Sequence, residues 1–202
     1  MIHFILKSIS YIFHPLLMPL FGVIFYFYQS PRFIPKDVVS AKVISISILT
    51  ILLPILVYSL LKIIGKAKSI HLQTTRERII PLAANCIIVF LIINYVVTSE
   101  LLFELYFFFL GILISNLSCL ILAVMNFKAS IHMIAASGII MFFIALSIHF
   151  SININTTLAI MTILVGAIAT SRLHLNAHTY KELIMGVFIG FVPQLLLVSY
   201  WL

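Results

Sequence analysis

Charged residues are scarce in this sequence, and acidic residues are the scarcest of them. Charged side chains make up 8% of the 202 residues, Asp and Glu together number five, and hydrophobic residues make up 63%. A water-soluble domain of this size has too little interior to hide that much apolar surface, so the composition excludes a soluble enzyme or binding domain. The chain is therefore predicted to be an integral membrane protein.

Other features are missing as well. The two cysteines, Cys86 and Cys119, lie inside apolar runs, which is typical of buried small hydrophobic residues and says little about redox compartment. We find no internal repeat, no low-complexity tract and no linker long enough to separate domains, so residues 1–202 are predicted to form a single domain. No small-residue cleavage site follows the first apolar run, and we expect that run to remain as a membrane span.

The net charge of +7 does not predict nucleic-acid binding. The twelve basic residues lie between apolar runs and form no continuous basic face. Basic loops beside a membrane, and an anionic lipid headgroup as the ligand, explain this charge better. We therefore expect the lipid bilayer and a membrane lipid as partners, and no nucleic acid.

Long apolar runs predict the fold. A helix needs about 20 residues to span the hydrocarbon core, and these runs are continuous, whereas the strands of a membrane barrel alternate. The sequence therefore predicts an all-α bundle of six to seven transmembrane helices. We expect a kinked first helix, because it contains His14-Pro15 and Pro19. The sixth run is short, which leaves a count of six open. The candidate spans are 11–28, 43–64, 79–97, 103–124, 133–149, 157–170 and 183–201.

The connections between spans divide unequally between the two membrane faces. If each span crosses once, one face carries nine of the twelve basic residues, counting Lys7. The connections on that face are 62–78, 126–132 and 171–182, and those on the other face are 30–42, 98–102 and 150–155. Gathering the polar clusters on one face is what a single active site near one membrane surface requires.

Residues 171–182, SRLHLNAHTYKE, carry the strongest chemical signal. Charged groups beside or within a membrane are costly and are usually kept for function. Arg172 offers a planar fork of donors that suits a phosphate. His178 is a candidate nucleophile, and Glu182 follows it by four residues, so that the two share a face if this segment is helical.

Two further clusters could meet this one. Arg76 and Arg78 precede the third span, and both could reach one phosphate if the segment is a turn. The sequence KASIH, residues 128–132, opens the fifth span. Backbone N–H groups at a helix start favour an anion, and Lys128, Ser130 and His132 could add donors.

These motifs resemble the type 2 phosphatidic acid phosphatase superfamily of membrane lipid phosphatases. The family's third motif is Ser-Arg, five residues, His, three residues, Asp; Ser171, Arg172 and His178 match it in register, and Glu182 stands where the family has Asp. KASIH resembles the second motif, Pro-Ser-Gly-His, with Ser and His retained. The first motif, Lys, six residues, Arg-Pro, is matched loosely by His71, Arg76 or Arg78, and Pro81. The resemblance covers a phosphatase-like core of about 65–200.

The resemblance implies a mechanism without metal or cofactor. His178 would attack the phosphate and form a phosphohistidine, Glu182 would orient its ring, and His132 would be the general acid. The phosphate would be held by Arg172, Arg76 or Arg78, Lys128, Ser130 and Ser171. The substrate would be a phosphate monoester or pyrophosphate of an isoprenoid or glycerolipid, whose phosphate is hydrolysed or transferred.

The resemblance also implies a location, a bacterial cytoplasmic membrane with the site facing outward. The excess of basic residues on the site's face points instead to the cytoplasmic side. Four of those basic residues, Arg76, Arg78, Lys128 and Arg172, are candidates for catalysis, which weakens the charge argument, and we favour the outward face. The oligomeric state is not predicted.

Two alternatives belong to other classes. In a metal-dependent membrane enzyme, His174, His178 and Glu182 would stack on one face of a continuous helix, and His132 would complete the shell. A non-catalytic carrier or assembly protein would instead have polar residues threaded through the spans to both faces.

Several polar residues are predicted to be structural. Interhelical hydrogen bonds are the expected role of Asn85, Asn94 and Asn116. We interpret His14 and His149 as boundary or bundle residues, and Glu100 and Glu104 as residues that solvate a turn on the face opposite the site.

Overall fold

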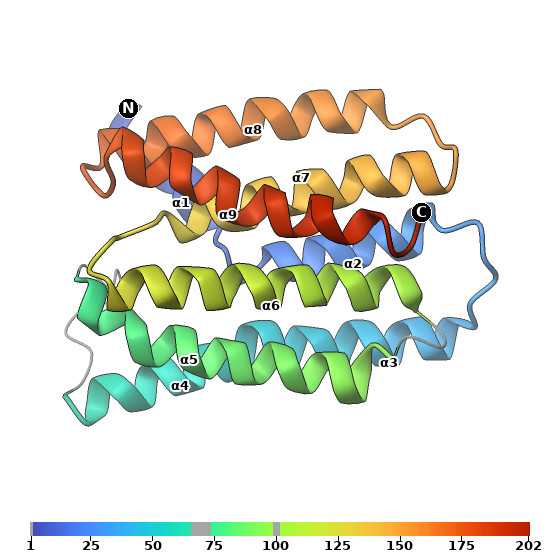
Figure 1. Cartoon of the computed structure of the whole chain (residues 1–202), viewed down its shortest axis with the longest axis horizontal. Coiled ribbons are helices and arrows are strands. Elements are labelled where there is room, and N and C mark those ends of the chain that lie inside the picture. The colour runs from blue at the N-terminus through green and yellow to red at the C-terminus, as the bar shows by residue number, and fades with distance from the viewer. Residues whose placement is uncertain (1, 66–73, 99–101) are drawn as a thin grey trace.

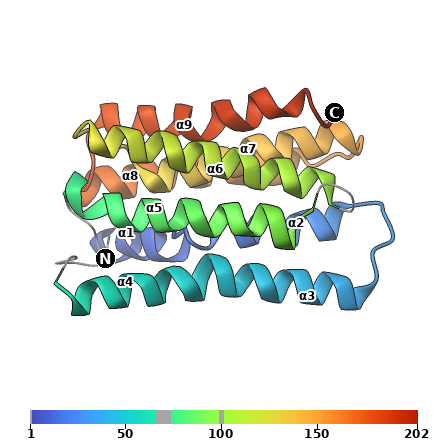
Figure 2. The same cartoon turned by 60° about the horizontal axis from the view of Figure 1, so that its bottom comes forward.

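The computed structural model describes residues 2–65, 74–98 and 102–202, and in these ranges all regular secondary structure is helical. His71 and Glu100 lie outside the described residues. Figures 1 and 2 show an elongated bundle whose long helices run side by side along one axis. In chain order, the helices are α1 Ile2–Ile12, α2 Met18–Gln29, α3 Lys36–Ser47, the π-helix η1 Ile48–Leu52, α4 Leu53–Ile63, α5 Thr75–Leu91, the π-helix η2 Ile92–Val96, α6 Phe103–Val124, α7 Ile131–His149, α8 Asn155–His174 and α9 Tyr180–Val198.

The predicted all-α membrane fold is confirmed. In the described part of the chain, six helical segments are long and apolar enough to cross a membrane, and α2 is a shorter apolar helix. The protein is therefore a multi-pass membrane protein. The six segments are Lys36–Ile63, Thr75–Val96, Phe103–Val124, Ile131–His149, Asn155–His174 and Tyr180–Val198.

The predicted first span, 11–28, is broken. α1 ends at Ile12 and α2 begins at Met18. Pro15 cannot donate to a helical hydrogen bond, and Pro19 lies in the first turn of α2, where the missing N–H has no cost. The break leaves His14 and the residues beside it outside regular helix.

Two other predicted boundaries were wrong. The short span at 157–170 extends over α8, so Ser171 and Arg172 lie in the last helical turn instead of a connection. The second span begins at Lys36, so half of the expected connection at 30–42 is helix. Hydropathy does not detect these polar helix ends, because a helix can continue past the hydrocarbon into the interface.

The polar connections gather at one end of the bundle. In Figure 1 the start of α5, the α6–α7 connection and the α8–α9 connection lie at the end that carries the N-terminus. We call this the site end. The connections α2–α3 and α7–α8, and the C-terminus, lie toward the opposite end, as the alternating count of crossings predicts.

Helix α7 is the centre of the bundle, and it packs closely on α9 through glycines. About 61% of its span is buried, against 11% for the outer spans α3–α4 and α8. A Cβ on Gly186 would lie 2.8 Å from the Ser130 carbonyl oxygen, and a Cβ on Gly190 would collide with the carbonyl oxygen of Ile134. Small residues allow this backbone approach, which is a common way for membrane helices to associate.

We expect Gly190→Ala to destabilise the protein by about 2–3 kcal/mol, because the new methyl group meets backbone that cannot move aside. Thermal unfolding in detergent measures this effect. Gly166→Ala is the matched control, because a Cβ there would meet nothing within 4 Å. Equal midpoints for the two variants would contradict the packing argument.

Candidate functional site

A large cavity opens at the site end and continues into the bundle. Its volume is about 1480 Å³, and α1, α4, α5, α6, α7 and the α8–α9 connection contribute to its wall. Aliphatic and aromatic side chains form most of the lining. Its basic residues are Lys7, Lys62, Arg78, Lys128 and Arg172, and no carboxylate among the described residues lines it. The cavity therefore favours a molecule with an anionic head and an apolar body.

The α8–α9 connection positions His178 on this wall. Asn176 adopts a left-handed conformation with φ of 49°. Its N–H donates to the Leu173 carbonyl, and the Ala177 N–H donates to the Arg172 carbonyl at 3.0 Å. This is the Schellman ending of α8, and Asn tolerates the left-handed position better than most residues. The helix therefore ends two residues after Arg172, and the chain turns back toward the cavity.

Glu182 has two roles at the start of α9. With Thr179 it forms a capping box, in which the carboxylate accepts the Thr179 N–H at 3.0 Å and the Thr179 hydroxyl accepts the Glu182 N–H. The same carboxylate oxygen lies 2.9 Å from Nδ1 of His178. The capping box therefore fixes the orientation of the Glu182 carboxylate, and this carboxylate in turn orients the imidazole of His178.

Three cations converge beside His178. Arg78 is buried in the first turns of α5, and its guanidinium donates to the Ala129 carbonyl at 3.0 Å. The ammonium of Lys128 donates to the Ala177 carbonyl at 3.0 Å, which ties the α6–α7 and α8–α9 connections together. Arg172 lines the same cavity, whereas Arg76 is exposed and does not. Of the two arginines before the third span, only Arg78 faces the cavity.

The N-terminal helix forms another wall of the site. Ser10 of α1 is buried, its carbonyl accepts from Nε2 of His132 at 3.2 Å, and its hydroxyl accepts from Arg172 at 3.4 Å. The Ser10 hydroxyl also lies 2.6 Å from that of Ser171, which donates to the Leu6 carbonyl. A chain of hydrogen bonds thus leads from Arg172 to Ser10, from Ser10 to Ser171, and from Ser171 to the backbone of α1.

Sequence reasoning missed this contribution from α1. The resemblance covered only residues 65–200, yet Ser10 and His14 both line the cavity. The ring of His14 lies edge-on to that of His132, with centroids 5.6 Å apart. The available signal was the break at His14-Pro15, which places a polar residue outside a helix within an apolar run.

The two predicted serines lie behind the cavity wall. Ser130 and Ser171 are fully buried, and neither lines the cavity. Among the described residues, the hydroxyl of Ser130 and Nε of Arg172 have no hydrogen-bond partner. An anion in the cavity would supply the acceptor that Nε of Arg172 lacks.

The metal alternative required residues 172–182 to be continuously helical, and the structure contradicts this. α8 ends at His174 and α9 begins at Tyr180. His174 is exposed, its Nε2 lies 3.4 Å from Nδ1 of His3, and it does not line the cavity. The described residues contain no group of three His, Cys, Asp or Glu side chains placed to hold a metal ion.

The electrostatics of the connections suit an anion. Burial, together with the charges of Arg78, Arg172 and Lys128, lowers the pKa of His178 to about 3, and a hydrogen bond with the Lys128 backbone opposes this only in part. Burial and the charge of Arg78 also lower the pKa of Lys128. His178 is therefore neutral at physiological pH, as a nucleophilic imidazole must be.

This shift predicts how stability depends on pH. Between pH 6.5 and about 3 the unfolded chain binds a proton on His178 that the folded chain does not. The free energy of unfolding should therefore fall as pH is lowered through this range, with the full His178 contribution present above pH 6.5. From pH 6.5 to pH 5, thermal unfolding in detergent should show a loss roughly 2 kcal/mol larger for the parent than for His178→Gln. An equal loss of stability in the parent and in His178→Gln would contradict the prediction. His174→Gln is the control and should lose as much stability as the parent.

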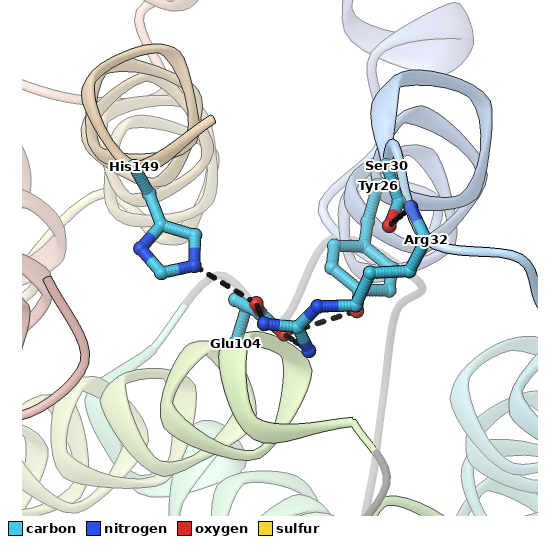
Figure 3. A network of polar contacts seen from close by, with 5 residues as sticks. All are labelled: Tyr26, Ser30, Arg32, Glu104 and His149. Carbon is cyan, nitrogen blue, oxygen red and sulfur yellow. Dashed lines mark hydrogen bonds and ion pairs between the residues drawn. The ribbon is translucent and has the colours of Figure 1, made fainter. Parts of the chain in front are cut away.

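Figure 3 shows a second buried polar network. It includes the first turn of α6 and the last residue of α7, which lie at the end of the bundle opposite the site end (Figure 1). Glu104 of α6 is fully buried, and its carboxylate pairs with Arg32 at 2.6 Å, accepts the Tyr26 hydroxyl at 3.0 Å and lies 3.1 Å from Nε2 of His149. Our interpretation of Glu104 as a solvated turn residue was wrong, whereas His149 is a bundle residue, which is one of the two roles predicted for it. The network joins α2, α6, α7 and the α2–α3 connection across the end of the bundle.

The fold and the cavity define a multi-pass helical membrane protein with a cationic, imidazole-containing cavity at one end. Comparison with known proteins adds no closer assignment, since no family model, no curated protein and no solved structure matches this chain. The motifs and the geometry of the cavity are therefore the features from which a function can be inferred.

Proposed function

We propose that this protein is a membrane lipid phosphatase that removes the phosphate of a lipid phosphate through a phosphohistidine intermediate. One observation carries the proposal: residues from three distant segments line a single cavity, with His178 beside Arg78, Lys128 and Arg172, and with His132 on the same wall. A phosphate needs positioning and charge stabilisation more than other chemistry, and three cations around one nucleophile supply both.

In the proposed mechanism the Glu182 carboxylate accepts a hydrogen bond from Nδ1–H of His178, which favours the tautomer whose Nε2 lone pair attacks phosphorus. A P–N bond forms while the bond from phosphorus to the lipid oxygen breaks. His132 acts as an imidazolium with a proton on each ring nitrogen: its Nε2–H stays on the Ser10 carbonyl, and the proton on Nδ1 passes to the leaving lipid oxygen. Water then attacks the phosphohistidine, His132 takes its proton, and inorganic phosphate leaves.

The apolar part of the cavity supports a lipid as substrate. The basic residues and His178 are at the site end, and the lining continues to Phe108 and Gln194, deep in the bundle. The headgroup would meet the cations while the hydrocarbon stays among apolar side chains, as it would in the bilayer. We place the site on the outward face of a bacterial cytoplasmic membrane, as the resemblance implies.

The test is phosphate release by the purified protein in detergent, from phosphatidate, phosphatidylglycerol phosphate and undecaprenyl phosphates. We expect release of inorganic phosphate that vanadate inhibits and a strong chelator leaves unchanged. Loss of activity in the chelator would favour the metal-dependent alternative. Lack of release from every lipid would favour the non-catalytic carrier.

A further inference from the structure

Two polar side chains that line the cavity below its cations each have a buried atom without a hydrogen-bond partner among the described residues. Asn116 of α6 is 8% exposed, and its side-chain N–H₂ has no partner among the described residues. The buried hydroxyl of Tyr58 on α4 likewise has none. Both residues line the cavity. An unpaired buried donor costs about 1–3 kcal/mol, so each of these groups calls for an acceptor on the bound molecule.

Asn116 and Tyr58 lie at similar depths below the site end of the bundle. Asn116 precedes the end of α6 by eight residues, which is about 12 Å along the helix axis, and Tyr58 precedes the end of α4 by five, which is about 8 Å. Asn85 lines the cavity two turns beyond Arg78 on α5. Asn85, Asn116 and Tyr58 therefore form a polar belt between the cationic end and the apolar floor at Phe108 and Ile139.

The donors of the belt fit one kind of acceptor in a lipid. An isoprenoid chain contains only carbon and hydrogen beyond its phosphate, and would leave both donors unpaired. An acyl lipid has a carbonyl oxygen a short way from its phosphate, at the junction with the hydrocarbon chain. We propose that the polar belt binds an acyl carbonyl, and that the substrate is an acylated lipid phosphate and not an isoprenoid phosphate. This inference rests on the proposed function.

The size of the cavity agrees with this assignment. Pockets for small ligands are typically about 300–1,000 Å³, and this cavity reaches about 1480 Å³. The space beyond the belt is lined by apolar side chains of α5, α6 and α7 and would receive an acyl chain. The phosphate headgroup would then contact the cationic end of the cavity, the carbonyl would contact the polar belt, and the hydrocarbon chain would lie among the apolar side chains.

The experiment compares lipid phosphates with and without a carbonyl acceptor, and its matched pair is the ester and the ether of the same glycerolipid. The full chain in detergent would be given dioleoyl phosphatidate, its dialkyl ether analogue, a ceramide phosphate and an isoprenyl monophosphate. We expect kcat/KM for the best carbonyl-containing lipid to exceed that for the ether analogue by about tenfold or more, the effect of one buried hydrogen bond. The ester and the amide lipids show which carbonyl is preferred.

The variants Asn116→Leu and Tyr58→Phe should each move the acyl-to-ether ratio toward one. Asn94→Leu is the matched control, because Asn94 lies outside the cavity and bonds its own helix at Phe90. Equal rates for acyl and ether lipids in the parent, or an equal loss on all lipids in both variants, would overturn the belt and leave the phosphatase intact. Thermal stabilisation of the protein by each lipid tests binding to the belt without turnover. If the protein releases no phosphate but is stabilised more by acyl lipids than by ether lipids, the polar belt is supported and the phosphatase proposal is contradicted.

Discussion

His178→Ala is expected to lower phosphate release by at least about a thousandfold, with little change in thermal stability. The alanine variant keeps the cavity and its cations but has no atom that can form the covalent intermediate. A thousandfold loss corresponds to about 4 kcal/mol of transition-state stabilisation. The measurement is kcat/KM for the best lipid phosphate, with parent and variant purified in the same detergent.

His174→Ala is the matched control for that experiment. It changes the same residue type four positions earlier, at an exposed site outside the cavity, and activity should stay within about twofold of the parent. Rapid quenching with labelled substrate should trap a labelled protein in the parent and in His174→Ala, and none in His178→Ala. Full activity in His178→Ala would remove this histidine from the mechanism.

Arg32→Met is expected to destabilise the protein by about 2–3 kcal/mol, a fall of roughly 5 to 10 °C in the thermal midpoint. Among the described residues, removing Arg32 leaves the fully buried Glu104 carboxylate with His149 and Tyr26 as its partners. The side chain of Arg32 is 47% exposed, which places the loss at the lower end for a buried pair. Thermal unfolding in detergent measures it.

Lys36→Met is the control, because Lys36 is an exposed cation near Arg32 in the sequence. The double variant Arg32→Met with Glu104→Gln should lose less than the sum of the two single variants, since the neutral amide needs no cation. Additive losses would show that Arg32 stabilises the chain through contacts other than the carboxylate. Phosphate release should change little in Arg32→Met, because this network joins the start of α6 to the end of α7, at the end of the bundle away from the site (Figure 1).

The fold was largely predictable from hydropathy, but its interruptions were not. The apolar run 103–124 coincides with α6. In a bilayer a continuous apolar segment must satisfy its own backbone hydrogen bonds, and a helix does this. The end of α8 escaped prediction because Ser171 and Arg172 look like a polar connection, although both are helical. Helix α8 ends because Asn176 adopts the left-handed backbone conformation, and a single Asn in a sequence is a weak indication of a helix end.

Contacts within the candidate site were predictable where its residues are near neighbours in sequence. His178 and Glu182 are four residues apart, and local geometry brings them together even though the helix begins only at Tyr180. The contact of Ser10 with His132 joins residues 122 positions apart, and it depends on how α1 packs on the bundle. Glu104 and His149 meet for the same reason, which a single sequence does not reveal.

The two chain ends lie toward opposite ends of the bundle, with α1 at the end that holds His178. The N-terminus and His178 therefore face the same aqueous compartment, and Leu202 faces the other one. A topology reporter fused after Leu202 would thus reveal on which side of the membrane the proposed reaction releases inorganic phosphate. Fusions at Met1 would instead burden the helix that supports His132, so the C-terminus is the place for any tag.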